Sequence, residues 1–446
     1  MRYSLLGILI LFSVVTMSQE LNFKKVDRLS YSYYMEGQWD SLITLVHKVE
    51  KQGIDYYYLN YRMGVAYYSK DNFFQSAYYF EKALEQNSRA YEDTSFSKML
   101  YLSYIYTLRK KKAMGVPLSV KQRVKPLMRT ALYLYGGGGS CVPLNLEDIQ
   151  RSGSNEQNSG YKPEQAYLLY QQGQILGGLS VSHVFNRKLS ADFSFTSFRF
   201  DDVTSFDNDD SLTINTFSIY QQSFAIIPEW NFGKRWSVRW TFGFMNNLGE
   251  PYILYNDKTV QTRTYLKYKL NGNSFLFGGN VYKQFRISRL GLELGMSNYT
   301  SQYQYQSGLN YLIYPWGNLN FYSYSSFSVK YENEEASIIF HQKIGIKTFS
   351  NLWAELSGKF GDIKNFNVFS EGYGYNITDH INTLLKGKLI FMISDNINLF
   401  VEGNFYKRYA FRNEIYADNS EDMSRVNYNY WTVVGGLSWN FNGGRK

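Results

Sequence analysis

The sequence predicts a membrane all-β fold: a transmembrane antiparallel β-barrel of about 16 strands, within a range of roughly 14–18, preceded by a small α-helical domain. Apolar and polar residues alternate over most of the chain from 124 to 441. The alternating segments are about 10–14 residues long, which suits tilted strands that cross a bilayer in about 9–11 residues. Aromatic residues make up 18% of the chain and gather near the segment ends, like the aromatic girdles of membrane barrels.

The alternation is clearest in three segments. Leu290, Leu292, Leu294 and Met296 are apolar, and the residues between them are Gly, Glu and Gly. Segments 236–244 and 338–346 show the same period of two. Successive side chains of a strand point to opposite faces, so each segment has one apolar and one polar face. A soluble all-β domain would also alternate, but it would hide the apolar face in a core, whereas a barrel turns that face toward outer-membrane lipid.

Full charges lie on the polar face, as expected for a water-filled lumen. The candidate lumen charges are Arg239, Glu293, Lys343, Lys359, Lys386, Lys388 and Glu402. Cations outnumber anions in the polar rows, which predicts a positive interior that favours anionic solutes. The alternative is that these charges pair with a loop folded into the barrel, and segment 138–169 is long enough to do so.

The first 18 residues have the pattern of a secretory signal peptide. Arg2 supplies a positive charge, and residues 5–15 form an apolar run that is too short to cross a bilayer as a helix. Thr16 and Ser18 are small residues placed for cleavage before Gln19. A retained signal anchor is the alternative. Export across an inner membrane, followed by a barrel, predicts the outer membrane of a Gram-negative cell.

Residues 19–112 are predicted to form a periplasmic helical domain, because the apolar period changes there to that of a helix. An internal repeat has an offset of 34 residues, the length of a tetratricopeptide repeat. The repeat aligns Leu29, Tyr33, Gly37, Trp39, Val46 and Val49 with Met63, Tyr67, Asp71, Phe73, Phe80 and Ala83. The second copy, 59–88, resembles that family: Gly64 stands where two helices approach, while Ser76 and Ser88 replace the usual alanine and proline.

Stacked helix pairs of this family commonly present a concave surface to a partner. The resemblance therefore implies docking of a periplasmic or outer-membrane protein, and a helical spacer that binds nothing is the alternative. The candidate docking residues are Tyr33, Trp39, Gly64, Tyr67, Phe73 and Phe80. A further helix at 95–110 matches the repeat poorly and is expected to cap the stack.

A linker at 113–123 is predicted to precede the barrel at 124–446. The basic run 109–112 is expected to be a solvated helix end, with a contact to lipid headgroups as the alternative. The expected strands are 126–137, 170–185, 189–200, 212–228, 235–247, 259–270, 274–286, 289–301, 304–315, 319–331, 336–347, 352–362, 366–377, 382–393, 397–411 and 428–441.

These strands sort the connections onto two sides of the barrel. The long connections 138–169, 201–211, 248–258 and 412–427 fall on one side. The short turns 186–188, 271–273 and 394–396 fall on the other. Membrane barrels have long external loops and short periplasmic turns, so the first strand is expected to run outward.

Catalytic and ligand-binding motifs are missing from the sequence. Gly136–Gly139 is not followed by Lys and Ser or Thr, so it is not a phosphate-binding loop. The four histidines lie in separate segments without metal-ligand spacing, and no serine-hydrolase or zinc-protease motif occurs. The net charge of +9 is spread along the chain. We expect no enzyme, no cofactor, no metal and no nucleic acid partner. The acidic residues at 201–210 are expected to form a solvated loop, with a calcium site as the alternative.

The order of signal peptide, tetratricopeptide-like helices and C-terminal barrel resembles the exopolysaccharide-export porins for cellulose and poly-N-acetylglucosamine. In that family the periplasmic helices gather the export machinery or polymer, and the barrel is the exit. Those exporters carry many more repeats than the two found here. Two functions stay open. One is a non-enzymatic outer-membrane protein that docks a partner and serves as a membrane anchor or as a subunit of a secretion or surface assembly. The other is a pore or exporter for a hydrophilic solute, including an anionic one, or a polysaccharide.

Overall fold

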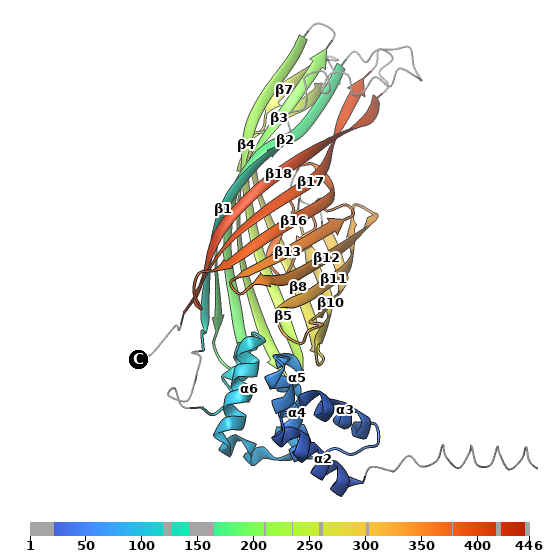
Figure 1. Cartoon of the computed structure of the whole chain (residues 1–446). Helices are drawn as coiled ribbons and strands as arrows, with labels where there is room; N and C mark the ends of the chain where they lie inside the picture. The colour runs from blue at the N-terminus through green and yellow to red at the C-terminus, as the bar shows by residue number, and fades with distance from the viewer. Residues whose placement is uncertain are drawn as a thin grey trace, which may run out of the picture. The chain divides into compact units, whose positions relative to one another are not determined.

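The computed structural model separates a helical unit from a barrel unit (Figure 1). The helical unit includes the chain up to Leu108 together with residues 116–118, and the barrel unit includes Arg109–Gly115 and the chain from Leu127 onward. The barrel unit thus begins slightly before the linker that the sequence predicts at 113–123. The described residues are 22–118, 127–141, 165–208, 211–233, 235–257, 262–299, 303–376, 378–415 and 421–441. The predicted signal peptide and the connection 142–164 lie outside them.

The helical unit consists of short amphipathic helices that pack in sequence order. They are α2 (Phe23–Met35), α3 (Trp39–Glu50), α4 (Tyr57–Ser69), α5 (Phe73–Gln86), the 3-10 turn η1 (Ser88–Glu92) and α6 (Thr94–Tyr106). Asn22 caps α2 and Asn72 caps α5, because their side chains accept from backbone N–H groups of the first turn. None of the described helices has the length and apolar character needed to cross a membrane.

The helix starts follow the repeat that the sequence predicts. Phe23 and Tyr57 begin α2 and α4, and Trp39 and Phe73 begin α3 and α5, so both pairs are 34 positions apart. Gly64 lets α4 and α5 approach closely, since a Cβ there would lie 2.6 Å from the Phe80 ring.

Ser76, which replaces the usual alanine of the repeat, is also accommodated. Its hydroxyl donates to the Gly64 carbonyl at 2.9 Å. These features agree with a tetratricopeptide-like packing, and membership of that family stays a prediction.

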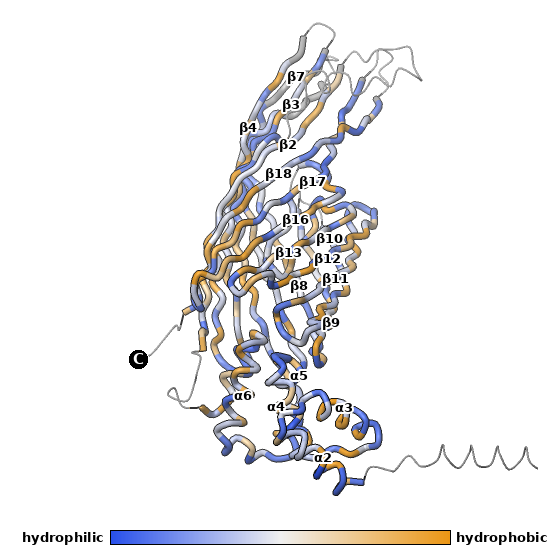
Figure 2. Tube along the Cα trace, viewed as in Figure 1, coloured by the Kyte–Doolittle hydropathy of each residue, from blue (hydrophilic) through white to orange (hydrophobic). Residues whose placement is uncertain are grey.

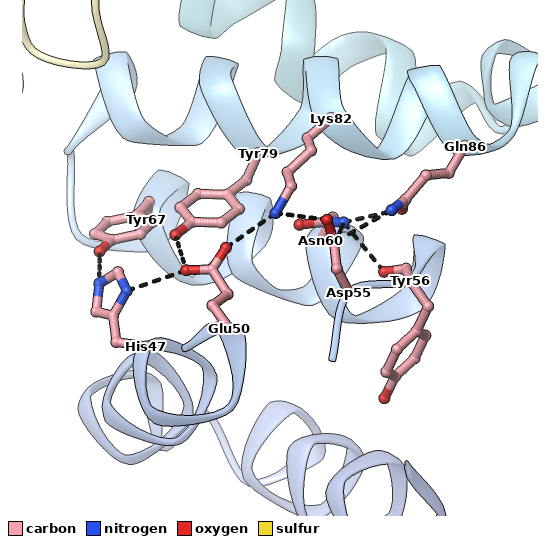
Figure 3. Close-up of polar contacts among 9 residues, drawn as sticks. All are labelled: His47, Glu50, Asp55, Tyr56, Asn60, Tyr67, Tyr79, Lys82 and Gln86. Carbon is pink, nitrogen blue, oxygen red and sulfur yellow. Dashed lines mark hydrogen bonds and ion pairs between the residues drawn. The ribbon is translucent and has the colours of Figure 1, made fainter. Parts of the chain in front are cut away.

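A polar network ties three of these helices together (Figure 3). The Lys82 ammonium of α5 lies 3.0 Å from Glu50 at the end of α3 and 2.9 Å from Asp55 before α4. Asp55 also accepts from the Asn60 amide at 2.6 Å, and Glu50 accepts from the Tyr79 hydroxyl at 3.1 Å. The helical unit is therefore held by paired charges as well as by its apolar core.

The barrel unit is a closed antiparallel sheet of 14 strands (Figure 1). The wall strands are β1 (Thr130–Cys141), β2 (Gln165–Val184), β3 (Leu189–Asn208), β4 (Ser211–Phe232), β5 (Trp236–Gly249), β8 (Leu270–Gln284), β9 (Ser288–Ser297), β10 (Gln304–Ile313), β11 (Phe321–Glu332), β12 (Glu335–Phe349), β13 (Leu352–Phe360), β16 (His380–Met392), β17 (Ile397–Ile415) and β18 (Glu421–Phe441). β1 pairs with both β2 and β18, which closes the sheet.

Two of the sixteen predicted strands are not part of the wall. The segment predicted at 259–270 forms a separate hairpin, β6 (Tyr252–Asp257) with β7 (Thr262–Lys267), and β5 pairs directly with β8. The segment predicted at 366–377 forms another hairpin, β14 (Asn367–Val368) with β15 (Tyr373–Gly374), and β13 pairs directly with β16. Both segments alternate in sequence, but their strands are shorter than the roughly 9–11 residues of a membrane crossing.

Long connections gather at one end of the barrel, as predicted, with three corrections. The expected loop 412–427 is wrong, because β17 and β18 run on until Ile415 pairs with Glu421. The expected loop 201–211 is wrong, because β3 and β4 run on until Asn208 pairs with Ser211. The expected short turn 271–273 is also wrong, because these residues lie within β8 beside the last residues of β5, at the same end as the long connections. The connections after β5, β13 and β17 share the end that bears the C-terminus of β1. We call this the loop end and the opposite end the turn end.

The outer face of the barrel is apolar. Leu290, Leu292, Leu294 and Met296 of β9 are 45%, 47%, 57% and 36% exposed, and they point away from the interior. Trp236, Trp240, Phe242 and Phe244 form a similar exposed row on β5. Apolar and polar residues alternate along the strands in Figure 2. The predicted alternation is therefore present, with the apolar rows on the outside.

A short helix, α7 (Lys110–Ala113), lies at the turn end of the barrel. The Lys111 ammonium is 2.6 Å from the Glu229 carboxylate of β4. The Lys110 ammonium is 3.4 Å from the Asn440 side chain of β18. The basic run, expected to be a solvated helix end, thus contacts the barrel wall.

Candidate functional site in the barrel lumen

The connection between β13 and β16 folds into the barrel as a hairpin, and we call residues 361–379 the inner hairpin. Gly361 has a φ of +121° where the chain leaves β13, and Gly372 has a φ of +75° at the tip. Both values suit glycine, which has no Cβ to clash. The backbone N–H groups of Glu371 and Gly372 donate to the Val368 carbonyl at 3.0 and 2.9 Å, which closes the tip.

An aromatic wedge fixes the tip against the wall. Phe369 is fully buried. Its ring lies against Gly278 of β8 and Gly295 of β9, where an added Cβ would clash with it. On the opposite side of the tip, Gly372 lies close to Ala225 of β4. Small residues on the wall thus create the space that the inner hairpin fills.

Hydrogen bonds also join the inner hairpin to the barrel wall. Asn367 and Gln306 of β10 exchange two hydrogen bonds of 3.1 Å, one through each backbone group of Asn367. The Asn367 amide also donates to Ser297 of β9 at 3.1 Å. Thr241 and Arg239 of β5 donate to the Phe369 and Ser370 carbonyls at 2.7 and 3.1 Å.

The two ends of the inner hairpin are held by charged groups. At its start, Asp362 lies 3.4 Å from Lys330 of β11 and 3.2 Å from His380. At its end, the buried Asp379 accepts from the Gln171 backbone N–H of β2 at 2.7 Å and from the Tyr428 hydroxyl of β18. Thr378 donates to the buried Asp202 of β3 at 2.9 Å.

Beside the inner hairpin the lumen keeps a cavity of about 560 Å³. This volume falls in the range of about 300–1,000 Å³ that is usual for small-molecule sites. Its charged lining residues are Lys343, Lys359, Lys386, Lys388, Arg408, Asp192, Glu355, Glu371 and Glu402. Uncharged hydrogen-bonding groups, among them Gln174, Ser194, Thr196 and Tyr135, line the cavity as well.

The structure places all seven predicted lumen charges on the inner face. Five of them line the cavity: Lys343, Lys359, Lys386, Lys388 and Glu402. Arg239 instead pairs with Asp192 at 2.5 Å and supports the tip of the inner hairpin. Glu293 accepts from Gln306 at 3.0 Å, and Gln306 in turn holds Asn367.

The cavity is less positive than the sequence predicts, because five cations face four anions among its described lining residues. The sequence reasoning missed Glu371 and Asp192. Glu371 lay in a segment read as a wall strand, although Phe366, Val368 and Phe369 form an apolar group that no single strand face could carry. The alternative named a loop folded into the barrel, and residues 361–379 are such a loop, while the segment named for it, 138–169, lies mainly outside the described residues.

The acidic cluster expected as a solvated loop is divided between the two faces of β3. Asp202 is buried and contacts the inner hairpin, whereas Asp201 pairs with Arg199 at 2.9 Å. Asp209 and Asp210 lie outside the described residues. The described residues contain no group of three or more His, Cys, Asp or Glu side chains that could hold a metal.

The predicted docking residues of the helical unit lie mostly between its helices. Gly64, Tyr67 and Phe80 are buried, and Tyr67 stacks on Tyr79 with ring centroids 5.6 Å apart. The partly buried residues are Tyr33, Trp39 and Phe73. Other aromatics are exposed: Tyr31 and Tyr58, at 52% and 60%, flank the Arg62 guanidinium at 5.3 and 5.9 Å. Tyr31 and Tyr58 stand off the apolar face of the repeat in the sequence, and that position could have indicated their exposure.

The fold and the site define a class: a closed 14-stranded barrel with an apolar exterior and a charged lumen partly filled by its own chain. No family model and no curated protein matches this sequence.

Three solved structures align with this chain and serve for comparison. A Pseudomonas aeruginosa FadL homologue aligns over 74% of this chain and 92% of its own, at 7% identity and a TM-score of 0.46. The toluene transporter TodX of P. putida aligns over 72% of this chain and 92% of its own, at 7% identity and a TM-score of 0.46. A bacterial polysaccharide outer membrane secretin aligns over 71% of this chain and 100% of its own, at 10% identity and a TM-score of 0.35. Similarities this low leave function to the geometry of the site itself.

Proposed function

We propose that this protein is a non-enzymatic outer-membrane β-barrel that provides a gated passage for a hydrophilic solute or polysaccharide. In this proposal the helical unit lies in the periplasm and binds a partner protein. The observation that carries the proposal is the lumen, where a charged cavity of about 560 Å³ lies beside a hairpin of the chain itself.

The exterior supports a membrane environment. A closed barrel satisfies its backbone hydrogen bonds within the sheet, which lipid requires. Rows of Trp, Phe, Leu and Ile face outward on neighbouring strands, such as Phe275 and Phe277 on β8 beside the rows of β5 and β9. Exposing such area to water is unfavourable by roughly 25 cal/mol per Å² of apolar surface. We infer that the apolar rows contact lipid.

The width of the barrel supports a passage. Eight strands give an interior that side chains alone can fill, whereas 16–18 strands leave an aqueous channel. A barrel of 14 strands lies between these cases, and here the inner hairpin takes up part of the remaining space. Displacing that hairpin would widen the cavity into a route along the barrel axis.

The expected cellular location rests on the amino-terminal signal pattern and the connections. The turn end, which carries the short β2–β3, β8–β9 and β16–β17 turns, would face the periplasm, and the loop end would face outward. The proposal of a non-enzymatic role is supported by His341, which lines the cavity and makes no hydrogen bond to a serine or a carboxylate among the described residues.

The second candidate function is a membrane anchor or subunit of a secretion or surface assembly. The dense bonding of the inner hairpin favours it, because a lumen closed at all times would leave docking as the remaining role. The exposed Tyr31 and Tyr58 of the helical unit would then be the first docking residues to examine.

Planar-bilayer recordings separate the two functions. The full chain is compared with a variant in which residues 365–375 are replaced by a short Gly-Ser linker. A variant with 252–267 replaced in the same way is the matched control. We expect the first replacement to raise conductance roughly tenfold or more, since large barrels with an unfilled lumen conduct. The control should behave like the full chain. If all three proteins insert and none conducts, the passage is excluded and the anchor is favoured.

A further inference from the structure

Four lysines converge on one wall of the lumen cavity. They come from three neighbouring strands: Lys343 from β12, Lys359 from β13, and Lys386 and Lys388 from β16. In the sheet register Lys343 is opposite Ser357, and Ser357 is opposite Lys386, so these two lysines lie two strands apart in one row. That spacing is about 10 Å between Cα atoms, which long lysine side chains can bridge around one anion.

The wall supplies two carboxylates near these four lysines, Glu355 and Glu402. Glu355 of β13 is opposite Lys388 in the register and accepts from the Tyr322 hydroxyl. Glu402 of β17 lies 3.5 Å from the Lys386 ammonium and 3.9 Å from that of Lys388. Lys359 has an aromatic partner instead, since its ammonium is 3.4 Å from the Tyr375 hydroxyl. Among the described residues, neither Lys343 nor Lys359 makes an ion pair. The cluster thus carries more positive charge than its own strands offset.

The inner hairpin supplies the missing carboxylate. Glu371 stands at the tip of the turn, where it is exposed to the same cavity. The cationic groups that act on it electrostatically are Lys386, Lys343, Lys359 and Lys388. Its place is set by the wedge of Phe369 and by the left-handed Gly372 on either side of it. Among the described residues Glu371 makes no ion pair with these lysines, so its carboxylate shares the cavity with the lysine cluster and acts on it across the cavity.

We propose that the lysine cluster is a binding site for a carboxylate-bearing, hydroxyl-rich solute, an acidic sugar, and that Glu371, in the same cavity, acts as an internal competitor for this site. This inference rests on the proposed passage and names its solute. The hydroxyl groups of the solute would meet Gln174, Ser194 and Thr196 on the facing strands of the same cavity. Rings of lysine and arginine in a lumen favour anions.

The competition couples binding to opening. A solute that binds only where Glu371 has left favours the state with the hairpin displaced, and it can shift the equilibrium only by its differential affinity for the two states. The carboxylate of the solute would take the place of Glu371 as the negative charge that acts on the lysines. In the displaced state the hairpin would lose this attraction, and after release of the solute Phe369 could return to its place beside Gly278 and Gly295, which closes the gate again.

Binding of D-glucuronate to the detergent-solubilised full chain tests this inference, with D-glucose as the neutral probe. We expect Glu371→Gln to bind glucuronate roughly tenfold more tightly than the unchanged protein, because the internal competitor is gone. Glu334→Gln at the exposed β11–β12 turn is the matched control and should leave affinity unchanged. Lys343→Met and Lys386→Met, each combined with Glu371→Gln, should lose the gain, and glucose should not bind to any variant.

Equal glucuronate affinity with and without Glu371 would overturn the inference, as would binding that survives loss of both lysines. If Glu371→Gln fails to fold, Glu371→Ala and Glu371→Ser serve instead, with circular dichroism as the check on folding. The binding assay does not depend on conduction. If the hairpin-replaced barrel conducts while the full chain with Glu371→Gln does not bind glucuronate, the site alone is disproved. Glucuronate binding by barrels that never conduct disproves the passage alone.

Discussion

Two hairpins leave the barrel at its loop end and enter opposite surroundings. The β6–β7 hairpin prolongs the β5–β8 connection, and its base carries the exposed pair Lys267 and Glu250, 2.7 Å apart. The β14–β15 hairpin lies inside the barrel, and Phe369 at its tip has no exposed surface. Both were predicted as wall strands from the same alternating pattern. The comparison shows that alternation indicates a strand, but does not tell what the strand pairs with.

The inner hairpin stays inside because apolar and polar contacts agree there. Phe369 fills the space left by two wall glycines, and Asn367 finds partners for its backbone and its side chain. Buried polar groups are costly unless they are hydrogen-bonded. The polar groups of an outward hairpin can hydrogen-bond to water, so that hairpin needs no partners on the barrel wall.

Phe369→Ala should have the largest effect on the comparison, because it should destabilise the inner hairpin and leave the β6–β7 hairpin unchanged. Removing a fully buried phenylalanine side chain costs about 3–5 kcal/mol. We expect amide hydrogen exchange across 365–375 to accelerate strongly, as the free energy of local opening falls. Tyr268→Ala, at the exposed base of the outer hairpin, is the control and should leave exchange in 365–375 as it was. Unchanged exchange in Phe369→Ala would mean that the wedge does not hold the hairpin.

Gly278→Val tests the same contact of Phe369 from the wall side. The new side chain would collide with the Phe369 ring. Overpacking of this kind costs about 1–3 kcal/mol. The control is Gly272→Val, on the same strand β8, where a Cβ meets no atom within 4 Å. We expect faster exchange in 365–375 for Gly278→Val only, and equal effects of both substitutions would contradict the proposed close fit.

Thr241→Val isolates one hydrogen bond. The Thr241 hydroxyl is fully buried and donates to the Phe369 carbonyl at 2.7 Å, and valine keeps nearly the same volume. The expected loss is about 0.5–1.5 kcal/mol of hairpin stability. Hydrogen exchange at the tip measures it, and combining this change with Phe369→Ala should give less than the sum, because the two groups touch the same turn.

In the helical unit, unlike the lumen, the charged groups remain close to water. The effect on stability expected there is the smallest. Burial raises the pKa of Asp55, but hydrogen bonds from Asn60, Lys82 and Gln86 and the charge of Lys82 outweigh it, so the pKa lies below its usual 3.8. A lowered pKa adds stability above pH 3.8, and this stability is lost as the pH falls through the lowered value.

The midpoint of thermal unfolding, followed by the helical circular dichroism signal, should therefore fall as the pH is lowered below about 4. Asp55→Asn should show a smaller fall over the same range, since asparagine has no carboxylate to protonate. An identical acid profile for both proteins would show that this carboxylate does not stabilise the helical unit.

The repeating patterns could be predicted because they are local. A period of two located all fourteen wall strands, including the row from Leu290 to Met296. The prediction for β1 is shifted by about four residues, and those for β3 and β18 are about eight and seven residues too short. The offset of 34 positions marked both helix pairs from Phe23 to Gln86. The charges at Lys343, Lys386 and Glu402 were assigned to the interior because they alternate with apolar neighbours.

The inner hairpin could not be found in this way, because its partners are distant in the sequence. Asn367 meets Gln306, and Phe369 meets Gly278 and Gly295, about 60 to 90 positions away. No local period marks such a match. The charge balance was misjudged for the same reason, since Glu371 enters the lumen only when the hairpin does.

The sequence by itself determined the strands, the helices and the side of each strand that is polar, because those properties depend on neighbours a few residues apart. Only the tertiary structure decided that 14 strands close the barrel and that residues 361–379 lie within it. Closure brings distant strands together, and the space between them selects the segment whose apolar and polar groups fit it.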